Sequence, residues 1–368
     1  MSNTVDWALA ERVAARIATR GEVVDEYALA RMAEDFEVMT PQAEKLVGEE
    51  TGLWSNQGEA RSRLVSRPDW IRANIASFQR LLAPVVDKLE VEDADGPMAK
   101  VAGRMAGIQV GTLLGWMSTR VLGQYDLLLT EDENPQDQDM VYYVGPNVLA
   151  LERRFGFNGE QFRLWLALHE CTHRAQFTGV PWLRDHFVSL VNETLENVDP
   201  DPGRLFDAVK DAVEARRRGE DPLADGGLPA LIAGPEQKAT LDKIGGMMSL
   251  LEGHGDVTMD RAGEDIVHDA PKFASTLRTR RESTKGVSKI VMKLVGLEAK
   301  MNQYAAGEDF IAYVEEHGGG PRIIDTAWQS ADTLPTLDEI KAPQQWLDRM
   351  GVDTPVPPVA ASSNGSSI

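Results

Sequence analysis

Residues 164–179 constrain the fold most strongly, because His169, Glu170 and His173 there form the pattern H-E-x-x-H. If this segment is helical, residues four apart lie on one face, so the two histidines can direct two ring nitrogens to one point. Neutral imidazoles suit zinc, and a carboxylate beside the ion can accept a proton from its bound water. A chance match in a chain of 368 residues has odds on the order of one in a hundred. The segment therefore predicts a metal site, with Glu170 as the general base.

The flanks of this pattern are typical of a buried helix. Asn158 is a favourable N-cap, and Gln161 three positions later can complete a capping box. Gly179 followed by Pro181 predicts the end of the helix. The residues between are largely apolar, so we expect a helix that is polar mainly towards the metal.

A second helix is predicted to begin at Pro235 and to supply the rest of the site. A catalytic zinc usually has three protein ligands and keeps its fourth position for water. Glu252 is the candidate third ligand, and His254 is its rival. Asp256, one helical turn after Glu252, can accept the second N–H of a ligand histidine and fix its tautomer.

Glycines indicate where helices approach closely. A run spaced by four residues in an apolar segment predicts a buried helix whose glycine ridge faces another helix, and the zinc helix is one candidate for that partner. Two more glycines weaken the second site helix and indicate a neighbour packed against it. These glycines are Gly103, Gly107, Gly111 and Gly115, followed by Gly253 and Gly255.

Together the two helices resemble those of zincin metallopeptidases, in which H-E-x-x-H is followed on a second helix by E-x-x-x-D, the gluzincin pattern. The whole chain is similar to an actinobacterial family described as zincin-like metallopeptidase type 2, also labelled as associated with deazaflavin-coenzyme biosynthesis. The resemblance covers roughly residues 5–350, in the segments QYDLLL, ALHECTHRAQF, LLEGHGDVTMD, KMNQYAAGEDF and LPTLDEI. It implies zinc ligands at His169, His173 and Glu252, a general base at Glu170 and a supporting carboxylate at Asp256.

Three further features bear on the site. Arg174 follows the second histidine, where zincins usually have an uncharged residue. Tyr304 either donates to a tetrahedral intermediate or is a buried core tyrosine. The basic group of Arg278, Arg280 and Arg281 either binds a substrate carboxylate or forms a solvated helix face.

The remaining pattern predicts a mainly α fold with a small β-sheet (α+β). Helices are expected over residues 4–48, with a new helical turn at Thr40-Pro41, and from Ser66 onwards. Residues 124–130 and 140–144 are predicted strands, which either present an edge to an extended peptide or only cover the core. We divide the chain into an N-terminal helical region (1–100), a zincin-like metallohydrolase core (101–350) and a disordered tail (351–368).

Charge and cysteine content narrow the possible partners. The formal net charge is −20, and neither nucleic acid nor an anionic membrane is expected to bind a chain with so few clustered Lys and Arg. No apolar run reaches the roughly 18 residues of a membrane span. The single cysteine, Cys171, excludes an internal disulfide, and with no apparent signal peptide we expect a cytoplasmic protein.

The sequence thus predicts a zinc-dependent hydrolase, a metallopeptidase acting on a peptide or protein substrate. The competing interpretation is a non-catalytic zinc protein with a structural or interaction role. A structural site is usually closed by a fourth protein ligand, but Cys171 is expected to point about 200° around the helix from His169. That geometry favours an open site, and the sequence leaves the oligomeric state undecided.

Overall fold

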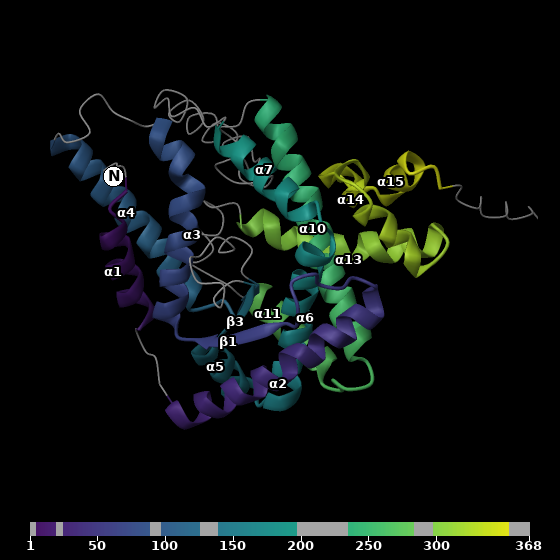
Figure 1. Cartoon of the computed structure of the whole chain (residues 1–368), viewed down its shortest axis with the longest axis horizontal. Helices are drawn as coiled ribbons and strands as arrows, with labels where there is room; N and C mark the ends of the chain where they lie inside the picture. Colours follow the sequence, from purple (N-terminus) through teal and green to yellow (C-terminus); the bar gives the residue numbers. More distant parts are fainter. Residues whose placement is uncertain are drawn as a thin grey trace, which may run out of the picture.

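The computed structural model describes residues 5–19, 25–88, 97–125, 139–196, 235–282 and 297–352 (Figure 1). Side chains near several of these limits, including that of Tyr304, lie outside the description. So do residues 126–130 of one predicted strand and nearly all of the predicted tail. Within the described part the protein is mainly helical with one small mixed sheet, as the sequence predicts.

Helices make up most of the described residues. They are α1 (Trp7–Ala18), α2 (Glu26–Thr51), α3 (Arg67–Lys88), α4 (Pro97–Ser118), α5 (Gly145–Phe155), α6 (Gly159–Gly179), α7 (Leu183–Glu196), α10 (Pro235–Gly263), α11 (Ala270–Glu282), α13 (Leu297–His317), α14 (Leu337–Lys341) and α15 (Pro343–Arg349), with short 3-10 turns at Pro321–Trp328 and Ala331–Thr333. None of the described helices is long and apolar enough to cross a membrane.

The sheet has the strand order β1-β3-β2. β3 (Met140–Val144) is buried along its whole length and pairs in parallel with β1 (Arg61–Val65) and antiparallel with β2 (Gly123–Tyr125). The prediction for 140–144 is confirmed, and the described start of the predicted 124–130 strand lies in β2. β1 was not predicted, because its arginines face outwards and its partner lies far along the chain.

Two helix predictions were wrong. α2 continues through Pro41 without a restart. The apolar residues on either side of that proline are fully buried, and their packing compensates for the backbone hydrogen bond that proline removes. These residues are Met32, Phe36, Ala43 and Val47.

The glycine ridge of α4 faces α1, so the predicted close approach of another helix is confirmed, but the candidate partner, the helix that carries His169 and His173, was wrong. A Cβ added at Gly107 or Gly111 would lie 2.4 Å from a backbone carbonyl oxygen of α1 or its N-cap. The opposite face of α4 is not buried, because Met105 and Ile108 are 58% and 47% exposed. Glycine spacing predicted the close approach, but it does not specify the partner.

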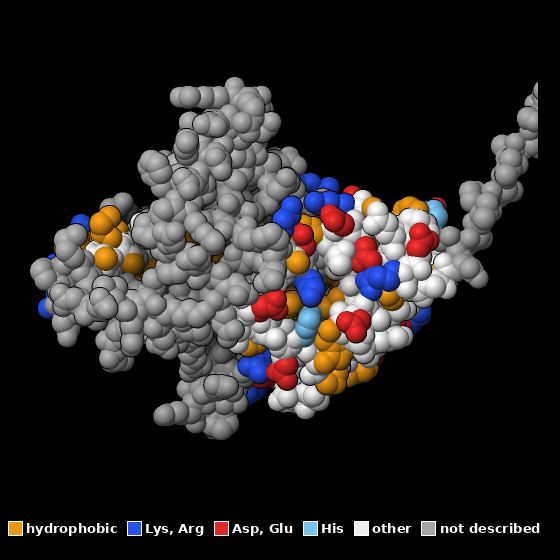
Figure 2. Space-filling view, turned by 90° about the horizontal axis from the view of Figure 1, so that it is seen from above, with side chains coloured by type: hydrophobic (Ala, Val, Ile, Leu, Met, Phe, Trp, Pro, Cys, Tyr) orange, Lys and Arg blue, Asp and Glu red, His pale blue; other side chains and the backbone are white. Residues whose placement is uncertain are grey.

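α6 packs against elements that come from distant parts of the chain. It packs against α2 on one side and against α10 on the other, and β2 also contacts it. Figure 1 shows α1, α3 and α4 grouped on one side of the sheet, with α14 and α15 beyond α10 and α13 packed across α10. Over the described part of the face in Figure 2, acidic and basic side chains intermingle. The division of the chain at residue 100 stays a prediction, although α2 and β1 pack around the same core as α6.

Candidate metal centre

The local sequence determines the position of α6. The side chain of Asn158 accepts a hydrogen bond from the backbone N–H of Gln161, so the predicted N-cap is confirmed. The predicted capping box is only half formed, because Gln161 Oε1 instead accepts from the backbone N–H of Asp269. The helix ends at Gly179, as predicted, and its middle turns present His169 and His173 on one face.

The structure brings together His169, His173 and Glu252, which we call the His–Glu cluster. Their nearest potential ligand atoms all lie within 4.8 Å of one another. The two Nε2 atoms are 3.1 Å apart, and Glu252 Oε2 lies 3.9 Å from His169 Nε2 and 3.7 Å from His173 Nε2. Ligand atoms around a tetrahedral zinc with bonds of about 2.0–2.1 Å would be ~3.3 Å apart. The donor types and spacing therefore fit a zinc ion after small adjustments.

Close helix packing makes this convergence possible. A Cβ added at Gly255 would lie 3.3 Å from His169 Cε1 and 3.4 Å from His173 Cε1, so α10 can run directly beside both rings. On another side of α10, a Cβ at Gly253 would lie 2.3 Å from the backbone of Gly307 in α13. Both glycines thus mark close neighbours, as the sequence predicts.

Glu170 lies beside the cluster in a buried position, with 7% of the residue exposed. Burial raises the pKa of Glu170 to about 7, and the charge of Glu252 acts in the same direction. His173 and a hydrogen bond from the Tyr125 backbone N–H act in the opposite direction. Gly123 leaves room for this carboxyl group, because a Cβ there would lie 2.5 Å from Glu170 Oε1. β2 therefore positions the Glu170 carboxyl group in two ways, since the Tyr125 N–H donates to it and Gly123 leaves space for it.

Asp256 lies behind His169. Its Oδ1 is 3.6 Å from His169 Nδ1, which is longer than a hydrogen bond but close enough for charge to favour an N–H on that nitrogen. A further carboxyl group, Glu308 of α13, was missed in the sequence. Burial raises the pKa of Glu308 to about 7, together with the charge of Asp256 and a hydrogen bond to it. Nothing in the spacing of KMNQYAAGEDF indicates that Glu308 reaches Asp256.

His254, the rival third ligand, is turned to a different partner. It is buried, and its Nδ1 lies 2.9 Å from Gln176 Nε2. Gln176 Oε1 in turn lies 3.0 Å from His173 Nδ1. Burial lowers the pKa of His254 to about 3, and the charges of His173 and Arg261 add to that effect. His254 is thus a neutral ring connected to the His–Glu cluster through Gln176, which sequence reasoning missed.

Arg174 points away from the His–Glu cluster into the protein. It is 1% exposed, and it donates to Asp139 Oδ2 at 2.5 Å, to the Gly58 carbonyl at 2.8 Å and to the Glu44 carboxylate. Tyr125 OH also donates to Asp139, at 3.1 Å. The charge that departs from the zincin pattern therefore connects α6 to α2 and to the strands beside Glu170.

The other candidate groups are not brought to the cluster by any described contact. Tyr304 lies in α13, but its side chain is outside the described residues, as are those of Arg280 and Arg281. Arg278 is exposed on α11. Cys171 Sγ faces the Thr40 carbonyl at 3.4 Å, so it points away from the histidines as expected.

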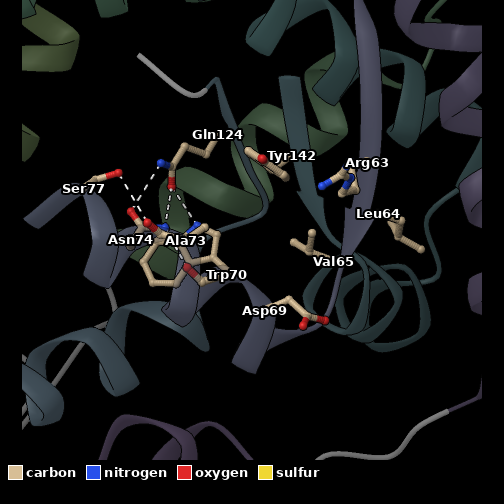
Figure 3. A pocket seen from close by; sticks show the side chains of 10 residues that line it. All are labelled: Arg63, Leu64, Val65, Asp69, Trp70, Ala73, Asn74, Ser77, Gln124 and Tyr142. Carbon is tan, nitrogen blue, oxygen red and sulfur yellow. Dashed lines mark hydrogen bonds between the residues drawn. The ribbon is translucent and has the colours of Figure 1, made fainter. Parts of the chain in front are cut away.

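A cavity of about 320 Å³ opens beside the two histidines. Apolar side chains form much of its wall, and the outer strand β2 forms another part. The wall includes Gly123, Tyr125, Phe177, Phe187, Met248 and Leu251. A separate cavity of about 250 Å³ lies between the sheet and α3, where Trp70, Asn74 and Gln124 hydrogen-bond to one another (Figure 3).

The chain is similar to known proteins well beyond the residues of this site. A family model for zincin-like metallopeptidases matches residues 5–347. A crystal structure from Chloroflexus aurantiacus, described as "a putative hydrolase with a novel fold", has a TM-score of 0.69 and 28% sequence identity. That match covers 94% of this chain and 99% of the other. No curated protein matches the chain. The similarity thus includes the N-terminal helices as well as α6 and α10.

Proposed function

Because the chain belongs to the zincin-like metallopeptidase family, we propose that it is a zinc-dependent peptidase. His169, His173 and Glu252 would hold the ion, and Glu170 would act as general base. The observation that carries this proposal is the convergence of three ligand atoms within 4.8 Å, beside a buried carboxyl group. Two nitrogen lone pairs and a carboxylate oxygen repel one another at these distances unless a proton or a cation lies among them.

Glu170 is suited to moving a proton in both directions. When bound at this site, zinc supplies an electrophile that acidifies water and polarises a carbonyl group. In the metal-free protein, burial raises the pKa of Glu170 to about 7. A bound zinc ion would lower this pKa and keep the group in the carboxylate form, which a general base needs in order to accept a proton. Glu170 takes a proton from the attacking water and then delivers it to the leaving amine. The Tyr125 backbone N–H holds one carboxylate oxygen in place during this transfer.

The surroundings favour a peptide over a small polar substrate. β2 is an outer strand of the described sheet and lines the cavity beside the histidines. An extended peptide can add to such an edge through its backbone, with alternate side chains in pockets. Phe177, Phe187 and Met248 provide an apolar wall for one such side chain. The hairpin interpretation, in which β2 only covers the core, does not account for its contact with Glu170.

The alternative is a non-catalytic zinc protein. A structural zinc usually has four protein ligands. Among the described residues, the group that fits a metal contains only His169, His173 and Glu252, and Cys171 faces the other way. An adjoining cavity on the ligand side also favours catalysis. Cytoplasmic localisation and the exclusion of nucleic acid remain predictions from composition.

The test is hydrolysis of a mixed peptide library by the zinc-loaded protein and by Glu170→Gln. The amide keeps the size of the side chain but cannot take a proton at neutral pH. We expect Glu170→Gln to keep its zinc and to lose about 10²–10⁴-fold in turnover. Zinc binding without turnover of any peptide would support the non-catalytic alternative. Turnover by zinc-loaded Glu170→Gln at the wild-type rate would refute Glu170 as the base.

A further inference from the structure

Gln176 lies three residues after His173 in α6 and is fully buried, with no exposed area. Its amide makes three hydrogen-bonding contacts. Oε1 is 3.0 Å from His173 Nδ1, while Nε2 is 3.0 Å from the Leu251 carbonyl and 2.9 Å from His254 Nδ1. One buried amide therefore joins the second histidine of the pattern to two residues of α10 that flank Glu252.

The Leu251 carbonyl fixes the orientation of this amide. A carbonyl oxygen can only accept, so the amide nitrogen of Gln176 has to face it. The second N–H of the same nitrogen then points to His254 Nδ1, which accepts it as a neutral ring. Oε1 is left for His173, and an amide oxygen can only accept. The Leu251 carbonyl of α10 thus decides which end of the amide faces which partner, because an amide oxygen turned towards it would face a second acceptor.

His173 must consequently carry its hydrogen on Nδ1. A neutral imidazole with a hydrogen on Nδ1 has its lone pair on Nε2. Nε2 is the atom that faces His169 Nε2 at 3.1 Å and Glu252 Oε2 at 3.7 Å. The lone pair therefore points at the centre of the His–Glu cluster.

We propose that Gln176 is a positioning residue that locks the tautomer and ring orientation of His173, with Leu251 and His254 locking Gln176 in turn. This inference rests on the proposed function, because the fixed lone pair matters only if His173 binds a metal. It also gives His254 a role other than that of a ligand. Because Leu251 precedes Glu252, the same hydrogen bonds set the distance between the ligand-bearing turns of α6 and α10.

The first measurement is the tautomer of His173 in metal-free protein labelled with ¹⁵N-histidine. At a pH high enough for the ring to be neutral, the ¹⁵N shifts should show a protonated Nδ1 and an unprotonated Nε2 in the wild type. In Gln176→Leu, which keeps the bulk but accepts no hydrogen bond, the two tautomers should mix. In Gln176→Glu, a buried carboxyl group that keeps its proton can donate to the Leu251 carbonyl and accept from His173 with its other oxygen, so the Nδ1–H form should return. Wild-type His173 with its hydrogen on Nε2 would overturn the proposal.

The second measurement is zinc affinity by competition with a chelator. Loss of a group that orients a ligand typically costs about 10- to 100-fold in metal affinity, and we expect this for Gln176→Leu. Gln176→Glu should bind zinc more tightly than Gln176→Leu. Thr172→Val is the matched control, because Thr172 is equally buried and its hydroxyl, among the described residues, donates to the Leu168 carbonyl of its own helix and does not contact the histidines. Equal affinities of Gln176→Leu and Thr172→Val would overturn the positioning role.

The two measurements separate this inference from the proposed function. A locked Nδ1–H tautomer in a protein that binds no zinc would refute the metal site and leave the Gln176 contacts intact. If Gln176→Leu bound zinc as tightly as the wild type, the positioning role would be refuted and the metal site would stand. Circular dichroism and the thermal midpoint of each variant show whether it is folded. The tautomer of wild-type His173 tests the proposal even if a variant does not fold.

Discussion

His173 and Arg174 are neighbours in α6, yet their side chains enter two different polar clusters. The His–Glu cluster consists of His169, His173 and Glu252, whose side chains are 16–23% exposed. The Arg174 cluster consists of Arg174, Asp139 and Glu44, with the Gly58 carbonyl and Tyr125 hydroxyl. In the Arg174 cluster, the buried cation faces two carboxylates. In the His–Glu cluster, atoms that can bind a cation face one another.

This difference separates a structural role from a ligand-binding one on a single helix. Buried opposite charges that hydrogen-bond to each other need no further partner. Converging lone pairs and a carboxylate need a cation or a proton to be stable. The two clusters are also connected, because Tyr125 donates its hydroxyl to Asp139 and its backbone N–H to Glu170. The Arg174 cluster thus holds the strand that positions the proposed base.

The largest expected effect comes from breaking the Arg174 cluster. Arg174→Met removes the cation and leaves the carboxylates of Asp139 and Glu44 without it in a largely buried position. Breaking a buried ion pair in this way typically costs about 3–5 kcal/mol. Denaturant unfolding should therefore show a large drop in the free energy of unfolding.

The matched control is Arg153→Met, whose ion pair with Asp25 lies at the surface. Ion pairs at the surface often contribute nothing measurable to stability, so the unfolding midpoint of Arg153→Met should stay at the wild-type value. Equal behaviour of the two variants would show that the Arg174 cluster does not hold α6 in place.

A pH-dependent effect is expected from Glu170 in the metal-free protein. Its pKa is about 7 in the folded state against 4.5 for an ordinary glutamate, so the folded state keeps the proton between these values. Since the unfolded state binds fewer protons in that window, stability should fall as pH rises from about 4.5 to 7. The loss is of the order of 3 kcal/mol by the conversion of pKa shifts to free energy.

Glu170→Gln cannot titrate, and it supplies the reference for this measurement. The difference in stability between wild type and Glu170→Gln should change with pH across the same window in metal-free protein. A constant difference would mean that burial does not hold the proton on Glu170. Added zinc should favour the carboxylate and move the change to lower pH.

A smaller effect is expected from Asp256→Ala. The charge of Asp256 lies 3.6 Å from His169 Nδ1 and favours the hydrogen on that nitrogen. Its removal should weaken zinc binding about 10- to 100-fold, as is typical when a group that orients a metal ligand is lost. Asp309→Ala removes an exposed carboxylate that neighbours Glu308 in the chain, and it should change zinc affinity far less. Similar losses in both variants would indicate a general charge effect.

The parts of the site that the sequence predicted are those with local spacing. His169 and His173 lie four apart on a helix, so their shared face follows from periodicity alone. Pro235 and Asn158 signalled the starts of the two site helices for equally local reasons. Glu252 is far from the histidines in sequence. The need for a third ligand made it a candidate with His254 as its rival, and the resemblance to gluzincins favoured Glu252.

The missed parts depend on contacts between distant segments. Gln176 obtains its role from Leu251 and His254, and Arg174 obtains its role from Asp139 and Glu44. Neither set of partners has a spacing that a pattern could reveal. β1 was missed for the same reason, because a short strand with outward arginines is stabilised by its pairing with β3.

The most direct test of the central claim is zinc stoichiometry, measured by elemental analysis on wild type, His173→Ala and Thr172→Val. We expect about one equivalent of zinc in wild type and in Thr172→Val, since a mononuclear site has one ion. His173→Ala should bind none while it keeps the helical circular dichroism of the metal-free wild type. A folded His173→Ala protein that retains a full equivalent of zinc would contradict the assignment of the His–Glu cluster as the metal centre.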